Sequence, residues 1–228
     1  MKKIGIFGAM DLEVETLINT MKEVKEHKCA GTSFYQGKLA NKEVVVACCG
    51  VGKVNAASCT QALISIFDID GIINTGIAGG MRPDVKVCDI VVSNEVTHHD
   101  VRREQMIHCY PNVEVFKADP HLIQVAKEVL QSNDHLHGNH HIGKIVSGEC
   151  FVNDKELKES IIENHKPHCV EMEGSAIGHV AYLNNIPFVV IRSISDNADN
   201  EADMTYKEFE SIAARQSSNL VMEMLKHL

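Results

Sequence analysis

Long apolar runs and large clusters of positive charge are both missing from this 228-residue chain. No apolar stretch approaches the roughly 20 residues that a helix needs to cross a bilayer, so the sequence predicts no membrane span. The formal net charge is −9 at pH 7. Because nucleic acids and anionic membranes attract clustered Lys and Arg, neither is expected as a partner.

The cysteines lack the regular spacing of a disulfide framework. The eight residues form no C-x-x-C motif, and Cys48 and Cys49 are neighbours that cannot easily bridge each other. Several others lie within apolar runs, where a reduced cysteine behaves as a small hydrophobic residue. The apolar stretch after Lys2 and Lys3 has no cleavage site and runs directly into acidic residues, unlike a secretion signal. We therefore expect reduced thiols and a cytoplasmic protein.

Internal repeats, low-complexity tracts and linkers rich in Pro, Gly or Ser are absent as well, which predicts a single domain over residues 1–228. Apolar strand-like runs alternate with helical patterns from residues 4–7 to residues 188–191. This alternation predicts an α/β domain with a mostly parallel or mixed central sheet. The 44% apolar content is sufficient for a sizeable core.

Three local patterns give more detailed predictions. Residues 34–37 and 44–49 are expected to form a hairpin. The segment 95–116 has no clear periodicity and is expected to be a long loop. The last helix is expected to begin at Thr205, because Thr205 and Glu208 have the spacing of a capping box.

Acidic residues and glycines follow several of the predicted strands. Ligands of open α/β sheets bind beyond the carboxyl ends of the strands, so these positions form the candidate site. The carboxylates there are Glu13, Glu171, Glu173 and Asp196, and Arg192 is the cation. Glycine turns allow a ligand to approach the backbone. Four acids and one Arg suit a neutral, polyhydroxylated ligand better than a phosphate.

Other motifs do not fit their templates. Gly52-Lys53 lacks the earlier glycine and the following Ser or Thr of a phosphate-binding P-loop. The glycines of residues 76–80 lack the dinucleotide spacing, and no serine stands on a G-x-S-x-G elbow. The histidines of residues 135–141 are interpreted as a polar surface turn, because no carboxylate or cysteine completes a metal site. Neither a metal nor an organic cofactor is expected.

Five motifs, in this order, resemble those of bacterial 5′-methylthioadenosine/S-adenosylhomocysteine nucleosidases. They are GAMDLEV (8–14), GVGKVNAA (50–57), INTGIAGG (73–80), VEME (170–173) and FVVIRSISD (188–196). The resemblance covers nearly the whole chain. It implies the nucleoside phosphorylase-like fold, a single-domain three-layer α/β/α sandwich. It also implies hydrolysis of an N-glycosidic bond that releases adenine and a 5′-thioribose, without metal or organic cofactor. It further implies a cytoplasmic homodimer that serves methionine salvage.

The resemblance also implies roles for individual residues. Asp196 would be the general acid that protonates the purine at N7, which requires a pKa raised by burial. Glu13 would orient and deprotonate the attacking water, with Arg192 nearby, and Glu173 would bind the ribose hydroxyls. Met172 would lie beneath the sugar, Phe151 would stack on the adenine, and the Val152 backbone would contact the adenine edge. The remaining substrate contacts would be Glu171, Ile77, Met10, Val51, Ser195 and Tyr206.

Two positions depart from the family pattern. Ile77 stands where the family usually carries a serine that helps to hold the catalytic water. The segment 100–116 is shorter than usual, and Arg102 and Arg103 replace aromatic residues and a proline that line the 5′-alkylthio pocket from the partner subunit. The sequence therefore leaves three alternatives open: a changed 5′ specificity, a nucleoside phosphorylase, and a non-catalytic nucleoside-binding relative.

Overall fold

The computed structural model describes residues 1–133, 136 and 138–228, in which helices and strands alternate along the chain. The strands are β1 (Lys3–Gly8), β2 (Lys22–Cys29), β3 (Thr32–Leu39), β4 (Lys42–Cys48), β5 (Gly71–Gly80), β6 (Ile90–His98), β7 (Phe116–Lys117), β8 (His140–Ser147), β9 (Cys169–Glu171) and β10 (Phe188–Asp196). The helices are α1 (Asp11–Thr20), α2 (Lys53–Phe67), α3 (Arg103–His108), α4 (Pro120–Ser132), α5 (Lys155–His165), α6 (Gly174–Leu183) and α7 (Ala202–Met224).

The strands form one mixed sheet whose second half closes on itself. From the edge inward the order is β2-β3-β4-β1-β5. From β5 the pairing continues around a ring through β10, β6, β8 and β9 back to β5. The pairings of β1 with β4 and β5, of β10 with β5, and of β8 with β6 and β9 are parallel. The predicted sandwich with a mixed central sheet is confirmed, whereas the ring was not predicted.

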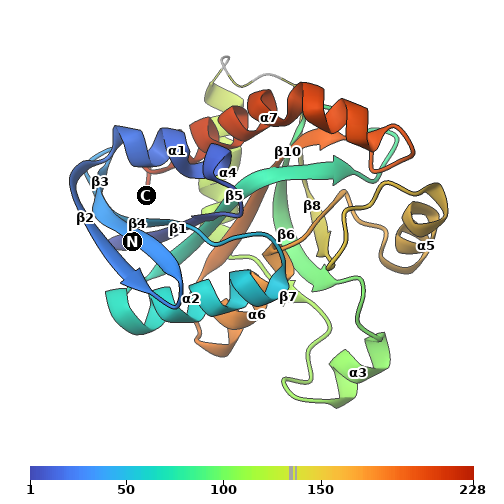
Figure 1. The fold of residues 1–228 in the computed structure, drawn as a ribbon, viewed down its shortest axis with the longest axis horizontal. Helices are drawn as coiled ribbons and strands as arrows, with labels where there is room; N and C mark the ends of the chain where they lie inside the picture. Colours follow the sequence, from blue (N-terminus) through green and yellow to red (C-terminus); the bar gives the residue numbers. More distant parts are fainter. Residues whose placement is uncertain (134–135, 137) are drawn as a thin grey trace.

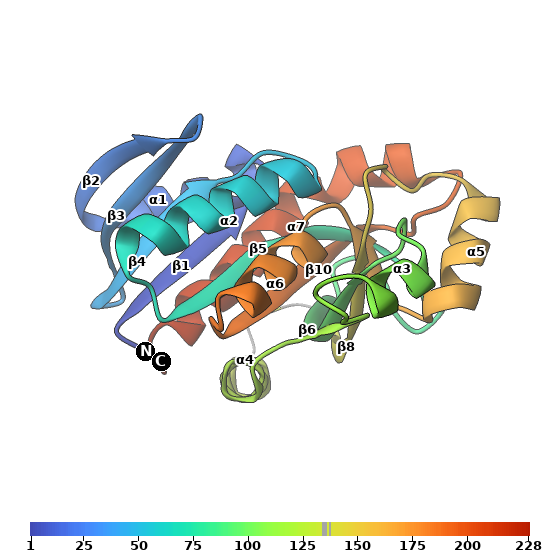
Figure 2. The ribbon, with the colours of Figure 1, turned by 90° about the horizontal axis from the view of Figure 1, so that it is seen from below.

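Helices cover both faces of the sheet, as Figure 1 shows. Helices α1, α4 and α7 pack together on one face, and α2 and α6 pack together on the other. Both faces of the central strands are therefore buried, which explains why β1, β5 and β10 are continuous apolar runs rather than alternating ones. Figure 2 shows α3 and α5 at the end of the molecule opposite β2 and β3.

The structure corrects two predictions about local elements and confirms a third. The hairpin of β3 and β4 is confirmed. The segment 95–116 is not one loop, because β6 continues to His98 and α3 follows. The last helix begins at Ala202 rather than at Thr205. The Thr205 hydroxyl donates to the Glu201 carbonyl one turn earlier, at 3.2 Å, which is the alternative bond that Thr can form inside a helix.

Strand β2 was missed entirely, and its composition explains why. Its sequence is KEVKEHKC, and all of its residues except Cys29 are exposed. An edge strand with charged side chains on both faces has no apolar alternation to reveal it, and such charge protects the edge from pairing with other chains.

Several whole-chain properties can be compared with the sequence predictions. Within the described residues, no helix is both long and apolar enough to span a bilayer. All eight cysteines are free. The predicted turn over residues 135–141 falls partly on residues 135 and 137, which lie outside the described residues. His141 lies at the start of β8, where its Nε2 is 3.0 Å from Asp89 Oδ2.

Candidate active site

A cavity of about 530 Å³ opens at the carboxyl ends of β1, β5, β9 and β10, where the strand topology predicted the ligand site. The structure brings eleven of the thirteen predicted site residues to its wall: Met10, Glu13, Val51, Ile77, Phe151, Glu171, Met172, Glu173, Ser195, Asp196 and Tyr206. The other two lie just behind the wall. Arg192 is buried beneath the carboxylates, and Val152 lines a small adjoining cavity of about 30 Å³ beside Phe151.

The carboxylate of Glu13 is held by backbone amides. Its Oε2 accepts hydrogen bonds from Ala9 N (2.6 Å) and Met10 N (3.0 Å), and its Oε1 accepts one from Ile77 N (3.0 Å). An ionised carboxylate has about four acceptor sites, so roughly one remains for a water molecule. Burial raises the pKa of Glu13, although the Arg192 charge and the three amides favour the ionised form. Glu13 is therefore an oriented base with one open acceptor position.

Gly76 allows Glu13 and Arg192 to lie against the same stretch of β5. A Cβ atom at this position would overlap Glu13 Oε1 and would lie 2.9 Å from Arg192 Nη1. Any side chain here would push apart the acid and the guanidinium. The glycine motif after residue 75 therefore supplies room for the protein's own side chains.

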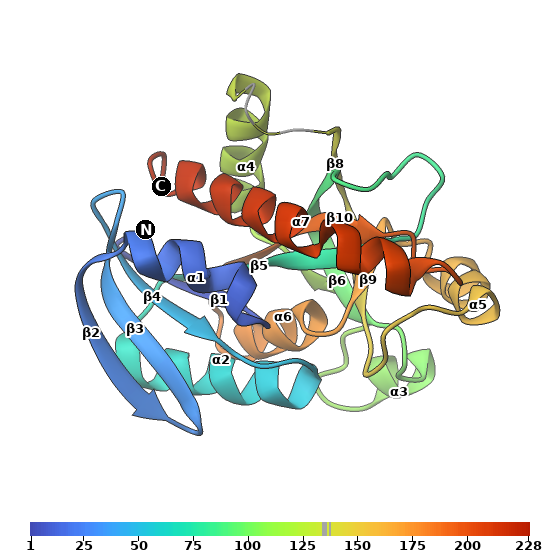
Figure 3. The same ribbon diagram turned by 45° about the horizontal axis from the view of Figure 1, so that its top comes forward.

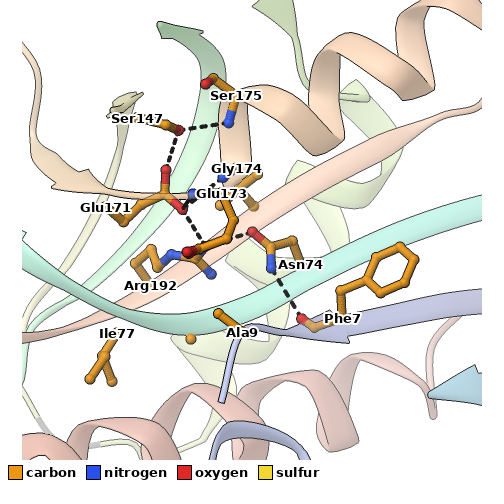
Figure 4. Close-up of polar contacts among 12 residues, drawn as sticks. Phe7, Ala9, Asn74, Ile77, Ser147, Glu171, Glu173, Gly174, Ser175 and Arg192 are labelled. Atoms are coloured by element: carbon orange, nitrogen blue, oxygen red, sulfur yellow. Dashed lines mark hydrogen bonds and ion pairs between the residues drawn. The ribbon is translucent and has the colours of Figure 1, made fainter. Parts of the chain in front are cut away.

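Glu171 is the centre of a buried polar network (Figure 4). Its Oε1 accepts the Ser147 hydroxyl, and its Oε2 accepts Gly174 N (2.7 Å), Glu173 N (3.1 Å) and an Arg192 Nη2 proton. With both oxygens occupied in this way, Glu171 has little capacity left for a ligand. Its main role is to hold the turn between β9 and α6 and to neutralise Arg192.

Arg192 is fully buried and its guanidinium is already engaged. Nη2 donates to Asn74 Oδ1 at 2.7 Å and to Glu171, and it lies 3.8 Å from Glu173 Oε2. Burial alone would lower the pKa of Arg192, but the carboxylates of Glu171, Glu13 and Glu173 raise it above its ordinary value. Arg192 therefore acts through these carboxylates, since it does not reach the cavity wall.

Glu173 is the residue immediately before α6, and it lines the cavity. Its Oε1 accepts Gly52 N at 2.9 Å, at the N-terminus of α2. Gly52 has φ +97°, a conformation that glycine adopts readily and other residues rarely. Burial first, and the Glu171 charge second, raise the pKa of Glu173 to about 8. One oxygen is thus anchored on a helix N-terminus, and the other remains near Arg192 at the cavity.

Asp196 is the last residue of β10 and is 1% exposed. Its Oδ1 accepts Ala198 N at 2.7 Å, and the Ser195 hydroxyl lies 2.8 Å from Oδ2. Burial raises the pKa of Asp196, although these two bonds favour the ionised form. The Ala198 amide can only donate, whereas the Ser195 hydroxyl can rotate to accept, so Oδ2 is the oxygen that can carry a proton.

Aromatic and apolar side chains complete the wall. Phe151 is 40% exposed and meets Tyr206 edge to face, with ring centroids 5.6 Å apart. The Tyr206 hydroxyl lies 3.4 Å from Met10 Sδ. Ile77 packs with Ala213, Ala214 and the side chains of Met10 and Tyr206. An apolar side chain therefore stands next to Glu13, where the family usually has a hydroxyl.

Sequence reasoning missed some of the residues that build the site. Ser147 and Asn74 hold Glu171 and Arg192, and a polar residue inside an apolar strand pattern was the available signal for Asn74. Asp203, Lys207 and Glu210 also line the cavity, from α7. Charged residues on an amphipathic helix carry no signal of this kind. Within the described part of the chain, no group of three or more His, Cys, Asp or Glu is placed to hold a metal.

Comparisons with known proteins agree with this geometry. Residues 3–226 match the family model described as the phosphorylase superfamily. A 5′-methylthioadenosine/S-adenosylhomocysteine nucleosidase of Exiguobacterium is 41% identical over 99% of this chain and 98% of its own length. The crystal structure of the nucleosidase of the same name from Colwellia psychrerythraea, in complex with adenine, has a TM-score of 0.95 at 38% identity and covers 100% of this chain and 96% of its own. The structure of a futalosine hydrolase of Helicobacter pylori has a TM-score of 0.92 at 33% identity. The match covers 100% of this chain and 98% of that one.

The fold and the acid-lined cavity thus define a member of the phosphorylase superfamily. Within it, the chain belongs to the family of 5′-methylthioadenosine/S-adenosylhomocysteine nucleosidases. The family resemblance inferred from the five sequence motifs is confirmed.

Proposed function

We propose that the protein hydrolyses the N-glycosidic bond of 5′-methylthioadenosine and S-adenosylhomocysteine and releases adenine and the 5′-thioribose. The observation that carries the proposal is the pairing, in one cavity, of a backbone-anchored Glu13 with a buried Asp196 whose pKa is raised. The first carboxylate can activate water and the second can donate a proton. This division of roles between two carboxyl groups is the general requirement for cleaving a glycosidic bond.

Asp196 protonates the leaving base. Departure of adenine as an anion would be slow, and a proton on the ring nitrogen N7 lets the base leave neutral. Oδ2 holds this proton when the Ser195 hydroxyl turns to accept from it, because the Ala198 amide on Oδ1 can only donate. Burial raises the pKa of Asp196 and so keeps the acid form available above the ordinary carboxyl range.

Glu13 activates the attacking water. Three amides fix the carboxylate, and the remaining acceptor position binds the water and takes its proton as the water attacks the anomeric carbon. The positive charge that develops on the ribose in the transition state is stabilised by the carboxylates around it.

Glu173 and Met172 bind the sugar. The Glu173 oxygen that is not anchored on Gly52 accepts the ribose hydroxyls, and Met172 contributes a soft apolar surface beneath the ring. Phe151 stacks on the adenine, and Val152 stands at the edge of the small adjoining cavity. Met10, Val51, Ile77, Ser195 and Tyr206 complete the pocket.

Hydrolysis is favoured over phosphorolysis because the groups near Glu13 and Glu173 that would suit a phosphate are already occupied by acids of the protein. The N-terminus of α2 would suit a phosphate, but Glu173 occupies Gly52 N and Glu149 occupies Lys53 N at 2.7 Å. The Arg192 guanidinium is taken up by Glu171 and Asn74.

Adenine release from 5′-methylthioadenosine is therefore expected to be independent of inorganic phosphate. Chromatography of the products with and without phosphate measures this directly, and the sugar product should be the free 5-methylthioribose in both cases. Phosphate-dependent release, with a sugar 1-phosphate as product, would refute the hydrolase assignment and support a phosphorylase.

A second candidate is a nucleosidase with a different 5′ substituent. It is favoured by the close structural match to a futalosine hydrolase, with a TM-score of 0.92, and by the short segment 100–116, which carries Arg102 and Arg103. A panel of adenosines with different 5′ groups, tested together with futalosine, distinguishes the two by their relative kcat/KM. A non-catalytic nucleoside-binding relative would release a free base from none of them.

We also propose that the protein is a cytoplasmic homodimer that serves methionine salvage. Its free cysteines suit a reducing compartment. Support for the dimer comes from an open groove between α2 and α6, where Val54 and Leu183 are 78% and 40% exposed.

The dimer is expected to dissociate when Val54 is replaced by Glu, because a charge would have to be buried against the partner. Sedimentation velocity should give twice the mass of one chain for the unmodified protein and a single-chain mass for the variant. Replacing Ile66, which is exposed elsewhere on α2, by Glu is the matched control. A monomeric unmodified protein would contradict the proposal.

A further inference from the structure

A stripe of charged residues from α7 stands at the wall of the active-site cavity. Asp203, Lys207 and Glu210 are spaced four and three residues apart, so they lie on one face of the helix, and all three line the cavity. Figure 3 shows α7 running across the sheet, with its first turns at the end of the molecule that carries α5. None of the three residues has a role in the mechanism described above.

Lys207 is the cation of this stripe, and it is not neutralised by a neighbouring acid. Among the described residues, it is the only Lys or Arg that lines the cavity. Within the same residues, no Asp or Glu oxygen lies within 4.0 Å of its Nζ atom. The two acids have no ionic partner within that distance either, and Asp203 Oδ2 accepts from Asn153 Nδ2 at 3.2 Å.

The rest of this part of the cavity is apolar. Met10, Val51, Ile77 and Tyr206 form a surface suited to a thioether, and the charged stripe follows on the Tyr206 side. A methylthio group would end on the apolar surface. A longer 5′ substituent that ends in an amino acid would bring a carboxylate and an ammonium group to residues of opposite charge.

We propose that Lys207 binds the carboxylate of the 5′ substituent, that Asp203 and Glu210 bind its ammonium group, and that this stripe makes the enzyme favour amino-acid-bearing nucleosides over 5′-methylthioadenosine. The inference rests on the proposed function, because it assigns the 5′ end of the same substrate. It makes Lys207 a specificity-determining residue that does not take part in bond cleavage.

The test compares four substrates in the Lys207→Met variant: 5′-methylthioadenosine, 5′-butylthioadenosine, S-adenosylhomocysteine and its decarboxylated analogue, the 3-aminopropylthio compound. The ratio of kcat/KM for S-adenosylhomocysteine to that for 5′-methylthioadenosine is expected to fall up to about five-fold, the upper end of the range for an exposed ion pair. The loss should appear in KM rather than in kcat, and Lys207→Glu should increase it to about ten-fold. The ratio for the decarboxylated analogue should not fall, because that analogue has no carboxylate.

Two further measurements separate this role from a general effect on the fold. The preference of the unmodified enzyme should weaken at high ionic strength, because salt screens exposed charges. Asp203→Asn should lower the ratios for both ammonium-bearing substrates and spare the neutral butylthio compound. Lys155→Met, on α5, is the matched control, because Lys155 is exposed and does not line the cavity.

The inference is overturned if Lys207→Met leaves the ratio unchanged, or if it lowers kcat/KM for all four substrates equally. Either result differs from failure of the proposed function, in which the unmodified protein would release no adenine from 5′-methylthioadenosine.

Discussion

Replacing Asp196 by Asn is expected to remove nearly all turnover while nucleoside binding is retained. The amide has the same shape and can still accept Ala198 N, but it cannot deliver a proton to the leaving base. General acid catalysis of this kind contributes about 10²–10⁴-fold, so kcat should fall by that factor. Steady-state kinetics give kcat, and calorimetric titration with an uncleavable nucleoside analogue gives the affinity.

The pH dependence provides an independent check of the same assignment. Asp196 is active when protonated, and burial raises its pKa, so kcat should fall as the pH rises through that raised value. In Asp196→Asn the residual activity should lack this alkaline limb. Asp84→Asn, at an exposed position paired with Arg82, is the matched control and should retain the full profile. Unchanged turnover in Asp196→Asn would refute the assignment.

Replacing Glu171 by Ala is expected to cause the largest loss of stability. The substitution leaves the buried Arg192 guanidinium without its main counter-ion, and it also removes the acceptor of Ser147, Glu173 N and Gly174 N. Breaking a buried ion pair by removing one partner typically costs about 3–5 kcal/mol. Urea denaturation at a fixed protein concentration should show a reduced free energy of unfolding of that order.

Two comparison variants identify the cause of that loss. Glu171→Gln keeps the shape and most of the acceptors but removes the charge, so it should fall between the unmodified protein and Glu171→Ala. Glu223→Ala breaks the exposed pair with Lys226 and should have little effect, because water screens such pairs. A Glu171→Ala variant as stable as Glu223→Ala would show that the buried pair does not stabilise the fold.

The acid residues of the site could be predicted from the sequence because they follow directly on buried strands. Glu171 and Asp196 end β9 and β10, and the two strand ends flank Gly79 of β5, although β9 runs antiparallel and β10 parallel to that strand. Strand β2 and the charged stripe of α7 could not be predicted in this way. Both present charged residues to solvent or to a cavity, and nothing in their local pattern distinguishes them from an ordinary surface.

The roles of Glu171 and Arg192 also depended on the three-dimensional structure. The sequence places both at strand ends, where each is a candidate to contact the ligand. Their hydrogen bonds to each other, to Ser147 and to Asn74 make them the buried support of Glu173 instead. Partners separated by up to 118 residues determine this, and the local sequence carries no information about such pairs.

The sequence by itself determined the α/β class, the family and most of the residues that line the cavity. These follow from local patterns, because apolar periodicity and short motifs act over a few residues. The tertiary structure decided how the carboxylates share their hydrogen bonds, how the ring of strands closes, and that Lys207 of α7 lines the cavity. These depend on contacts between distant segments, and such contacts exist only after the chain has packed.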